Sequence, residues 1–301
     1  MPDMSSLESR SMGAAFSMRE PMHYQNSLRV GAAQINTTLG EVNDNLERHL
    51  ALIADAQHDD VELLVFPELS LTGYRLANRV MQVAMPLEDP RLQTLARACG
   101  PMQVVVGFVE EASPGEYYNA LAIFQHGQLI AVHRKLNLPT YGGLEEGKWF
   151  THGSELTHTD ICPGWSATQL ICADLWNPAL VHAALLARPT VLCAPINSAS
   201  GIVSDDFSNE ENWALNTRFY AMTYGTPVIM ANRFGPEGDS HFWGGSRILG
   251  PGGETLAQAN DEEALIVADL SRTAIAKARF ELPTHRDADT PLVRELMAGY
   301  R

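Results

Sequence analysis

Short apolar runs recur along the chain, and segments with helical spacing of their apolar residues separate them. The runs are typical of buried strands and lie at residues 28–35, 61–66, 104–109, 119–124, 128–132, 170–171, 190–197, 226–232, 244–249 and 263–270. Helical periodicity predicts helices over residues 43–59, 90–99, 179–187 and 212–224, and a partly helical segment from residue 271 onward. Turn residues at 125–127 and 250–253 predict two hairpins, the second pairing residues 244–249 with residues 263–270.

Strands and helices alternate without an intervening linker, which predicts one α/β domain over residues 28–290. Hairpins combined with strand–helix crossovers predict mixed rather than purely parallel sheets. Residues 1–27 are polar, rich in Ser and Met, and lack periodicity, so we expect a flexible N-terminal extension. We expect residues 291–301 to form a C-terminal tail.

Composition narrows the class of partner. The chain has 301 residues, 45% of them hydrophobic and 19% charged, which is typical of a globular protein. Its 21 basic and 36 acidic residues give a net charge of −15, which argues against nucleic acid and anionic membrane surfaces as partners. No apolar run approaches the roughly 18 residues that span a bilayer. We therefore expect a small-molecule substrate.

The cysteines indicate a reducing compartment. Four cysteines, none of them in a CxxC pair, do not suggest a disulfide framework or a zinc site. The N-terminus has no uninterrupted apolar region of the kind found in signal peptides. We expect a cytoplasmic protein without a metal or an organic cofactor.

One predicted strand ends in a cysteine. The apolar pair Leu170-Ile171 is followed by Cys172, a polar corner and Pro178, which opens a helix because proline is favoured in the first helical turn. This order lifts a thiol from a sheet edge toward free backbone N–H groups, which favour a thiolate and an oxyanion alike. The alternative is that Cys172 is a small core residue, as most cysteines are.

Two other strand ends carry groups suited to acyl transfer. Glu68 follows Pro67 at the end of the run 61–66, and Lys135 lies just beyond Val132. A carboxylate can accept the proton of a thiol, and an ammonium can hold an oxyanion. Each residue alone could be a solvated strand end, but the three residue types together predict a cleft for acyl transfer.

The segments around these three residues resemble motifs of the nitrilase, or carbon–nitrogen hydrolase, superfamily. They are Pro67-Glu68-Leu69 with Thr72-Gly73-Tyr74, Arg134-Lys135 with Leu138-Pro139, and Ile171-Cys172 with Asp174 and Pro178. Weaker matches are Tyr141-Gly142, Asn119, Asn232-Arg233 and Gly245-Ser246. The resemblance covers roughly residues 28–290.

The resemblance implies a single-domain α-β-β-α four-layer sandwich and a Glu–Lys–Cys triad. By matching position, Glu68 is the general base, Lys135 stabilises the oxyanion and Cys172 is the nucleophile. The backbone N–H of Ala173 is implied as a second donor to the oxyanion. Many members of the superfamily are dimers or larger assemblies, so we expect a homo-oligomer.

A second glutamate supports the triad in members of this superfamily. Glu146 fits the spacing best, and its neighbour Glu145 is a second possibility. The residues that we expect to contact substrate are Tyr74, Tyr141, Trp176 and Asn197. We expect the loops 138–150, 198–212 and 234–243 to set specificity, and Arg233 is the basic residue there that could face an anionic substrate.

The expected reaction is hydrolysis of a linear amide through a cysteine thioester, with release of ammonia or an amine. The residues after Cys172 do not match the Cys-Trp-Glu-His of true nitrilases, and no arginines follow as they do in some carbamoylases. Cys-x-Asp-Leu-Trp is more similar to the glutaminase module of NAD synthetases, although a synthetase domain does not follow. Nitrile or N-carbamoyl hydrolysis, acyl transfer to an amine, and a catalytically silent binding or assembly protein stay open as alternatives.

Overall fold

The computed structural model describes residues 24–204 and 206–300, so most of the predicted extension lies outside the described residues. The strands form two six-stranded sheets and a two-stranded ribbon. The first sheet has the order β14-β1-β2-β3-β4-β5, with β1 Ser27–Gln34, β2 Leu63–Val65, β3 Gln103–Ser113, β4 Glu116–Gln125, β5 Gln128–Arg134 and β14 Ala264–Ser271. The second has the order β13-β12-β9-β8-β7-β6, with β6 His158–Cys162, β7 Trp165–Gln169, β8 Val191–Ile196, β9 Val228–Asn232, β12 Arg247–Leu249 and β13 Thr255–Gln258. The ribbon pairs β10 Phe234–Glu237 with β11 Ser240–Trp243.

Helices cover the outer face of each sheet. The helices are α1 Val42–His58, α2 Val80–Val83, α3 Pro90–Cys99, α4 Pro178–Leu186, α5 Asn209–Tyr224, α6 Arg272–Glu281, α7 Thr284–Asp287 and α8 Thr290–Ala298. Three 3₁₀ turns lie at Ala77–Arg79, Glu146–Lys148 and Cys172–Trp176. Within the described part of the chain, no helix is both long and apolar enough to span a membrane.

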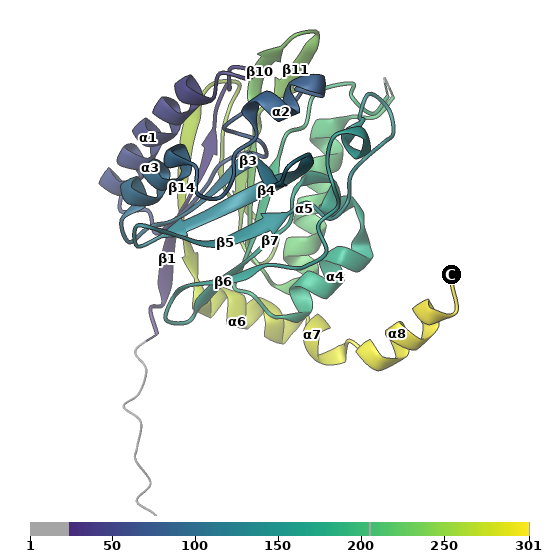
Figure 1. The fold of residues 1–301 in the computed structure, drawn as a ribbon. Helices are drawn as coiled ribbons and strands as arrows, with labels where there is room; N and C mark the ends of the chain where they lie inside the picture. The colour runs from purple at the N-terminus through teal and green to yellow at the C-terminus, as the bar shows by residue number, and fades with distance from the viewer. Residues whose placement is uncertain (1–23, 205, 301) are drawn as a thin grey trace, which may run out of the picture.

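Successive side chains along a strand face opposite sides of the sheet, so each sheet packs against the other sheet on one side and against helices on the other. In β1, Leu28, Val30 and Ala32 pack between the sheets, whereas Ala33 belongs to the core beneath the outer helices. The helices α1 and α3 lie on the first sheet, and α4 and α5 lie on the second (Figure 1). Both sheets contain parallel and antiparallel pairs. The predicted α-β-β-α sandwich with mixed sheets is thus confirmed.

Local sequence sets the helix starts near the site. Asn177 caps α4 by accepting a hydrogen bond from the N–H of Ala179, and Pro178 occupies the first turn as predicted. Ser208 caps α5 with its side chain, so this helix begins at Asn209 and not at the predicted residue 212.

The predicted pairing of residues 244–249 with residues 263–270 is wrong. β12 pairs with the short strand β13 instead, while β14 crosses to the first sheet and pairs antiparallel with β1. Gln34 fixes this crossing, because its side-chain amide donates to the carbonyls of Asn260 and Glu262 at 2.5 and 2.8 Å.

The pattern of apolar residues does not predict two short strand pairs. The strand before the cysteine is β7, not Leu170-Ile171, and it pairs with the edge strand β6, in which exposed polar residues break the apolar run. The segment 234–243, expected to be a loop, forms the ribbon β10–β11. Both pairs carry too few apolar residues to predict a buried strand.

Strand direction brings the polar strand ends together. β2 and β3 are parallel, β4 is antiparallel to both of its neighbours, and β5 therefore runs in the direction of β2. Glu68 and Lys135, which follow β2 and β5, leave the first sheet at the same edge. β7 and β8 are parallel, so Cys172 and Asn197 leave the second sheet together.

Candidate active site

Glu68 is fully buried just beyond β2. Its Oε1 accepts hydrogen bonds from Lys135 Nζ at 2.6 Å and from Asn119 Nδ2 at 2.7 Å. Its Oε2 has no hydrogen-bond partner within the described residues. Gly107 of β3 allows the backbone at residues 67–69 to pack closely against this strand, because a Cβ at Gly107 would lie 2.2 Å from the nitrogen of Leu69. One oxygen of the carboxylate is therefore fixed, and the other is open to a proton.

Lys135 lies between two buried carboxylates. Its Nζ also donates to Glu146 Oε1 at 2.7 Å, and the hydroxyl of Tyr74 donates to the same oxygen at 2.5 Å. Burial disfavours the ammonium, but the charges of Glu146 and Glu68 outweigh it and hold the pKa of Lys135 well above its usual value. Burial also raises the pKa of Glu146 to about 7, although Lys135 opposes this rise. Glu146 therefore titrates near neutral pH.

The two glutamates that the sequence left open occupy different environments. Glu146 is buried and contacts Lys135. Glu145 is exposed and pairs with Lys148 at the surface. Of the two, only Glu146 belongs to the buried cluster.

Cys172 opens a strained turn. Its φ of +44° is left-handed, which costs a residue with a Cβ on the order of 1 kcal/mol. Asp174 holds the turn, since its Oδ2 accepts the N–H of Ile171 at 2.9 Å and its Oδ1 accepts the N–H of Asn137 at 2.7 Å. Asn137 Nδ2 in turn donates to the carbonyl of Ala173 at 2.9 Å. The N–H of Ala173 makes no hydrogen bond within the described chain and is available to a ligand.

The thiol of Cys172 is neutral in this arrangement. Burial raises its pKa well above the usual value, and the carboxylate of Glu68 raises it further, while the charge of Lys135 lowers it. The expectation that free backbone N–H groups favour a thiolate does not hold for the resting thiol, because burial and the carboxylate of Glu68 outweigh the charge of Lys135. A base is therefore required to remove the thiol proton, and the open oxygen of Glu68 is suited to that task.

Tyr74 and Asn197, which we expected to contact substrate, belong to the buried cluster. Tyr74 bonds Glu146, as described above. Asn197 Nδ2 donates to the backbone carbonyl of Glu68 at 2.8 Å, and its backbone N–H approaches the thiol of Cys172. Its Oδ1 is buried and has no hydrogen-bond partner among the described residues.

Tyr141 and Trp176, the other two expected contacts, lie toward the surface. Tyr141 is 46% exposed, and burial raises its pKa. Trp176 is partly buried and packs edge-to-face on Trp213, with ring centroids 4.9 Å apart, and on Phe207. Neither side chain is hydrogen-bonded to the carboxylates of Glu68 and Glu146, whose partners are Lys135, Asn119 and Tyr74.

A buried ion pair supports Tyr74, and the sequence did not reveal it. The carboxylate of Glu237 accepts the backbone N–H groups of Tyr74 at 3.2 Å and of Arg75 at 2.6 Å. Arg233 pairs with Glu237 and donates to the carbonyl of Thr37 at 2.6 Å. Arg233 is therefore occupied, and its expected role toward an anionic substrate is not supported. The i, i+4 spacing of Arg233 and Glu237 is the one signal in the sequence, and such spacing indicates an ion pair on a helix, whereas residues 234–243 form a β-ribbon.

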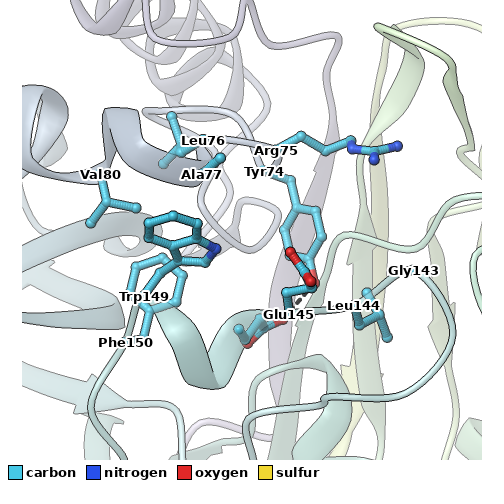
Figure 2. Close-up of a pocket in the computed structure, with 11 residues that line it drawn as sticks. Tyr74, Arg75, Leu76, Ala77, Val80, Gly143, Leu144, Glu145, Trp149 and Phe150 are labelled. Carbon is cyan, nitrogen blue, oxygen red and sulfur yellow. Dashed lines mark hydrogen bonds between the residues drawn. The ribbon is translucent and has the colours of Figure 1, made fainter.

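A pocket of about 130 Å³ lies on the outer side of the cluster formed by Glu68, Lys135 and Glu146. Figure 2 shows the residues that line it. It lies between the segment 74–80 and the loop 143–150, with the indole of Trp149 opposite Val80. Arg75 points away from it. Glu68, Lys135 and Cys172 do not line this pocket, which meets the buried cluster only through Tyr74 and Glu146.

The acidic and sulphur-containing side chains do not form a metal centre in residues 24–204 and 206–300. No three of the His, Cys, Asp and Glu side chains there are arranged to hold a metal ion. The ammonium of Lys135 occupies the space between the two carboxylates.

The chain is similar to known proteins in sequence, both to a family model and to individual relatives. The carbon–nitrogen hydrolase family model matches residues 29–280. The glutamine-dependent NAD(+) synthetase of Thermotoga maritima is 31% identical over 248 residues, which are 81% of this chain and 42% of that protein. The N-carbamoylputrescine amidase of Solanum lycopersicum is 29% identical over 293 residues, 92% of this chain and 97% of that protein. The chain thus spans less than half the length of the NAD(+) synthetases it matches.

Solved structures share the fold. The carbon–nitrogen hydrolase of Helicobacter pylori G27 superposes with a TM-score of 0.79 at 24% identity, covering 90% of this chain and 98% of that one. An amidase from Nesterenkonia sp. AN1, in complex with acrylamide, gives a TM-score of 0.76 at 24% identity and covers 89% and 97%.

The four-layer sandwich is the fold that the chain shares with these solved structures. The chain belongs to the carbon–nitrogen hydrolase family, whose model covers most of its length.

Proposed function

We propose that the protein hydrolyses a linear, non-peptide amide through a thioester on Cys172. The observation that carries this proposal is the open Oε2 of Glu68, whose other oxygen is fixed by Lys135 and Asn119. A buried carboxylate with one open oxygen, next to a neutral thiol on a strained turn, is suited to general base catalysis.

The first half of the reaction forms the thioester. Glu68 takes the thiol proton as Cys172 Sγ attacks the amide carbon, and the carbonyl oxygen becomes an oxyanion. Lys135 Nζ and the N–H of Ala173 stabilise this oxyanion. The C–N bond then breaks, the nitrogen takes the proton held by Glu68, and ammonia or an amine leaves.

The second half releases the acid. Glu68, again a carboxylate, takes a proton from water, and the resulting hydroxide attacks the thioester carbon. The same two donors stabilise the second oxyanion. The C–S bond breaks, the sulphur regains the proton from Glu68, and a carboxylic acid leaves.

A solved relative supports cysteine chemistry of this kind. In variants of the Nesterenkonia amidase, the acetamide moiety of fluoroacetamide is covalently attached to the active-site cysteine. The superposed fold and the cysteine at the end of β7 in the present chain are consistent with an equivalent attack on an amide-like carbon.

Hydrolysis of an N-carbamoyl amine is the second candidate function. It is favoured by the Solanum lycopersicum relative, which this chain matches over 97% of that protein's length. The same base, nucleophile and oxyanion donors would act on the carbamoyl carbon. The products would then be an amine, ammonia and carbon dioxide, which separate this reaction from simple amide hydrolysis.

The test is ammonia release from a panel of a short aliphatic amide, an aromatic amide, L-glutamine and N-carbamoylputrescine. The variant Cys172→Ala should lose more than about 10³-fold in kcat with an unchanged circular dichroism spectrum. Cys162→Ala is the matched control, since Cys162 is also a partly exposed free cysteine and should keep full activity. Full turnover by Cys172→Ala would sink the proposal, and no turnover of any substrate by the wild type would favour a silent relative.

Alkylation tests the proposed base without a known substrate. Because the resting thiol is neutral, iodoacetamide labelling of Cys172 should depend on Glu68, and Glu68→Gln should slow it by about 10²-fold. Labelling of Cys162 in the same sample serves as the internal reference. Equal labelling of Cys172 in both proteins would exclude Glu68 as the base.

A further inference from the structure

A second pocket lies at the opposite end of β8 from the candidate active site. It has a volume of about 390 Å³ and lies between α6 and the segment that leads into β8. Thr190 lines this pocket and comes immediately before β8, whereas Asn197 comes immediately after the strand and lies beside Cys172. The six residues of β8 span about 20 Å, so the two places are separate. Figure 1 shows α6 at the lower edge of the molecule, below β6.

Three arginines, Arg188, Arg272 and Arg279, line this second pocket. No aspartate or glutamate lines it, and none of the three arginines forms an ion pair within residues 24–204 and 206–300. The chain as a whole has 36 acidic and only 21 basic residues, so an unpaired basic cluster departs from its average charge. A pocket lined by charges of one sign attracts ligands of the opposite sign, which are anions here.

The backbone holds Arg279 in place. Its Nε donates to the carbonyl of Gly225 at 3.1 Å, and its Nη2 donates to the carbonyl of Pro189 at 2.5 Å and to the hydroxyl of Thr226 at 3.0 Å. Burial and, to a smaller extent, the charge of Arg188 lower the pKa of Arg279 to about 10. Two like charges thus lie close together, and an anion bound between them would relieve their repulsion.

The other two guanidinium groups keep free donors. Arg188 is exposed, and its side chain has no hydrogen-bond partner in the described part of the chain. Arg272 donates through Nη1 to the carbonyl of Gly164, and its guanidinium carbon lies 4.8 Å from the centre of the Tyr24 ring. Each guanidinium carries five N–H donors in a planar fork, and this fork matches the oxygens of a phosphate group.

One wall of the pocket is apolar. Ile275, Ala276 and Phe280 line it from α6, the helix that also carries Arg272 and Arg279. Residues 272, 275, 276 and 279 follow the i, i+3, i+4, i+7 spacing of one helix face. The ring of Phe280 is 84% exposed at the rim. An anion in this pocket can therefore carry an organic group that packs on the ring.

We propose that this pocket binds a phosphorylated small molecule, with its phosphate between Arg188 and Arg279 and its organic part against Phe280. A phosphate monoester is close to a dianion at neutral pH, so it can neutralise two arginines and accept hydrogen bonds on three oxygens. Inorganic phosphate has the same charged group but lacks the part that contacts Phe280. Because the pocket is about 20 Å from Cys172, binding there does not depend on the proposed amide hydrolysis.

The first experiment is isothermal titration calorimetry of the full chain with phenyl phosphate, at low ionic strength and without other multivalent anions. One site per chain is expected. Arg188→Gln should weaken binding by more than about 10-fold, because charge-assisted hydrogen bonds are lost. Arg218→Gln is the matched control, since Arg218 is an exposed arginine of α5 outside the pocket and the same charge is removed. Equal weakening by the two substitutions, or no binding to the wild type, would overturn the proposal.

The second experiment separates a phosphate monoester from free phosphate. Phe280→Ser should weaken phenyl phosphate by about 5-fold and leave the affinity for inorganic phosphate unchanged, whereas Arg188→Gln should weaken both. Inorganic phosphate that binds the wild type as tightly as phenyl phosphate would contradict the role of Phe280. Arg272→Gln replaces Arg188→Gln if the latter fails to fold by circular dichroism. No turnover is measured, so a failure here leaves the proposed function untouched.

Discussion

Two neighbouring glutamates each pair with a lysine, but the two pairs differ in physical character. Lys135 and Glu146 are 0% and 5% exposed and lie 2.7 Å apart, whereas Lys148 and Glu145 are 62% and 56% exposed. Water can replace either partner of the exposed pair at little cost, but a buried charge that loses its partner stays in a dry site. The same two residue types therefore build a reactive cluster in one place and a solvated surface in the other.

The largest expected effect comes from removing the shared cation. Lys135→Met leaves the buried carboxylates of Glu68 and Glu146 without their common partner, and we expect a loss of about 3–5 kcal/mol in unfolding free energy. The proposed oxyanion donor is lost as well, so kcat should fall by more than about 10²-fold. Urea denaturation and the amide assay measure the two effects.

Lys148→Met is the matched control for this change. Its pair is exposed, so the unfolding free energy should change by less than about 1 kcal/mol and kcat should be unaffected. Equal destabilisation by the two substitutions would contradict the difference between the pairs.

The sequence predicts the buried groups that follow strong apolar runs. Glu68 and Lys135 lie at strand ends, where the pattern changes from apolar to polar, and the motif match places Cys172 before a proline-initiated helix. Strand direction then brings these ends to one edge, which follows from the topology. The sequence could not separate Glu145 from Glu146, because adjacent residues in a glycine-rich loop have no periodicity to show which one points inward.

Other features depend on contacts between distant segments. The support of Tyr74 by Glu237 joins residues 163 positions apart. The crossing of β14 to the first sheet depends on Gln34, which no local pattern links to residues 260–262. The raised pKa of Cys172 results from burial, which the carboxylates of Glu68 and Glu146 reinforce and the ammonium of Lys135 opposes, and these contributions require the geometry.

An effect of intermediate size is expected from Glu146→Gln, which should change how the unfolding free energy depends on pH. The pKa of Glu146 is about 7 in the folded protein, against 4.5 for an ordinary glutamate, so folding favours its protonated form. The protonated Glu146 side chain thereby stabilises the folded protein by an amount on the order of 3 kcal/mol. This stabilisation is fully present below pH 4.5 and is lost as the pH rises through 7. Glu146→Gln should remove this fall from the urea-derived unfolding free energy.

Glu145→Gln should instead leave a pH profile parallel to that of the wild type, because Glu145 is exposed. A profile of Glu146→Gln that also parallels the wild type between pH 4.5 and 7 would show that Glu146 does not titrate in that range.

The smallest effect is expected from the hydroxyl that Tyr74 donates to Glu146. This bond favours the ionised carboxylate, so Tyr74→Phe should move the Glu146-linked fall in stability to higher pH. The substitution keeps the buried ring and should cost about 1 kcal/mol. Tyr141→Phe is the control, because Tyr141 lies near the site but is 46% exposed and should leave the midpoint unchanged. A midpoint that falls in Tyr74→Phe would mean that the hydroxyl does not stabilise the carboxylate, and Lys135 alone would then distinguish the buried pair from the exposed one.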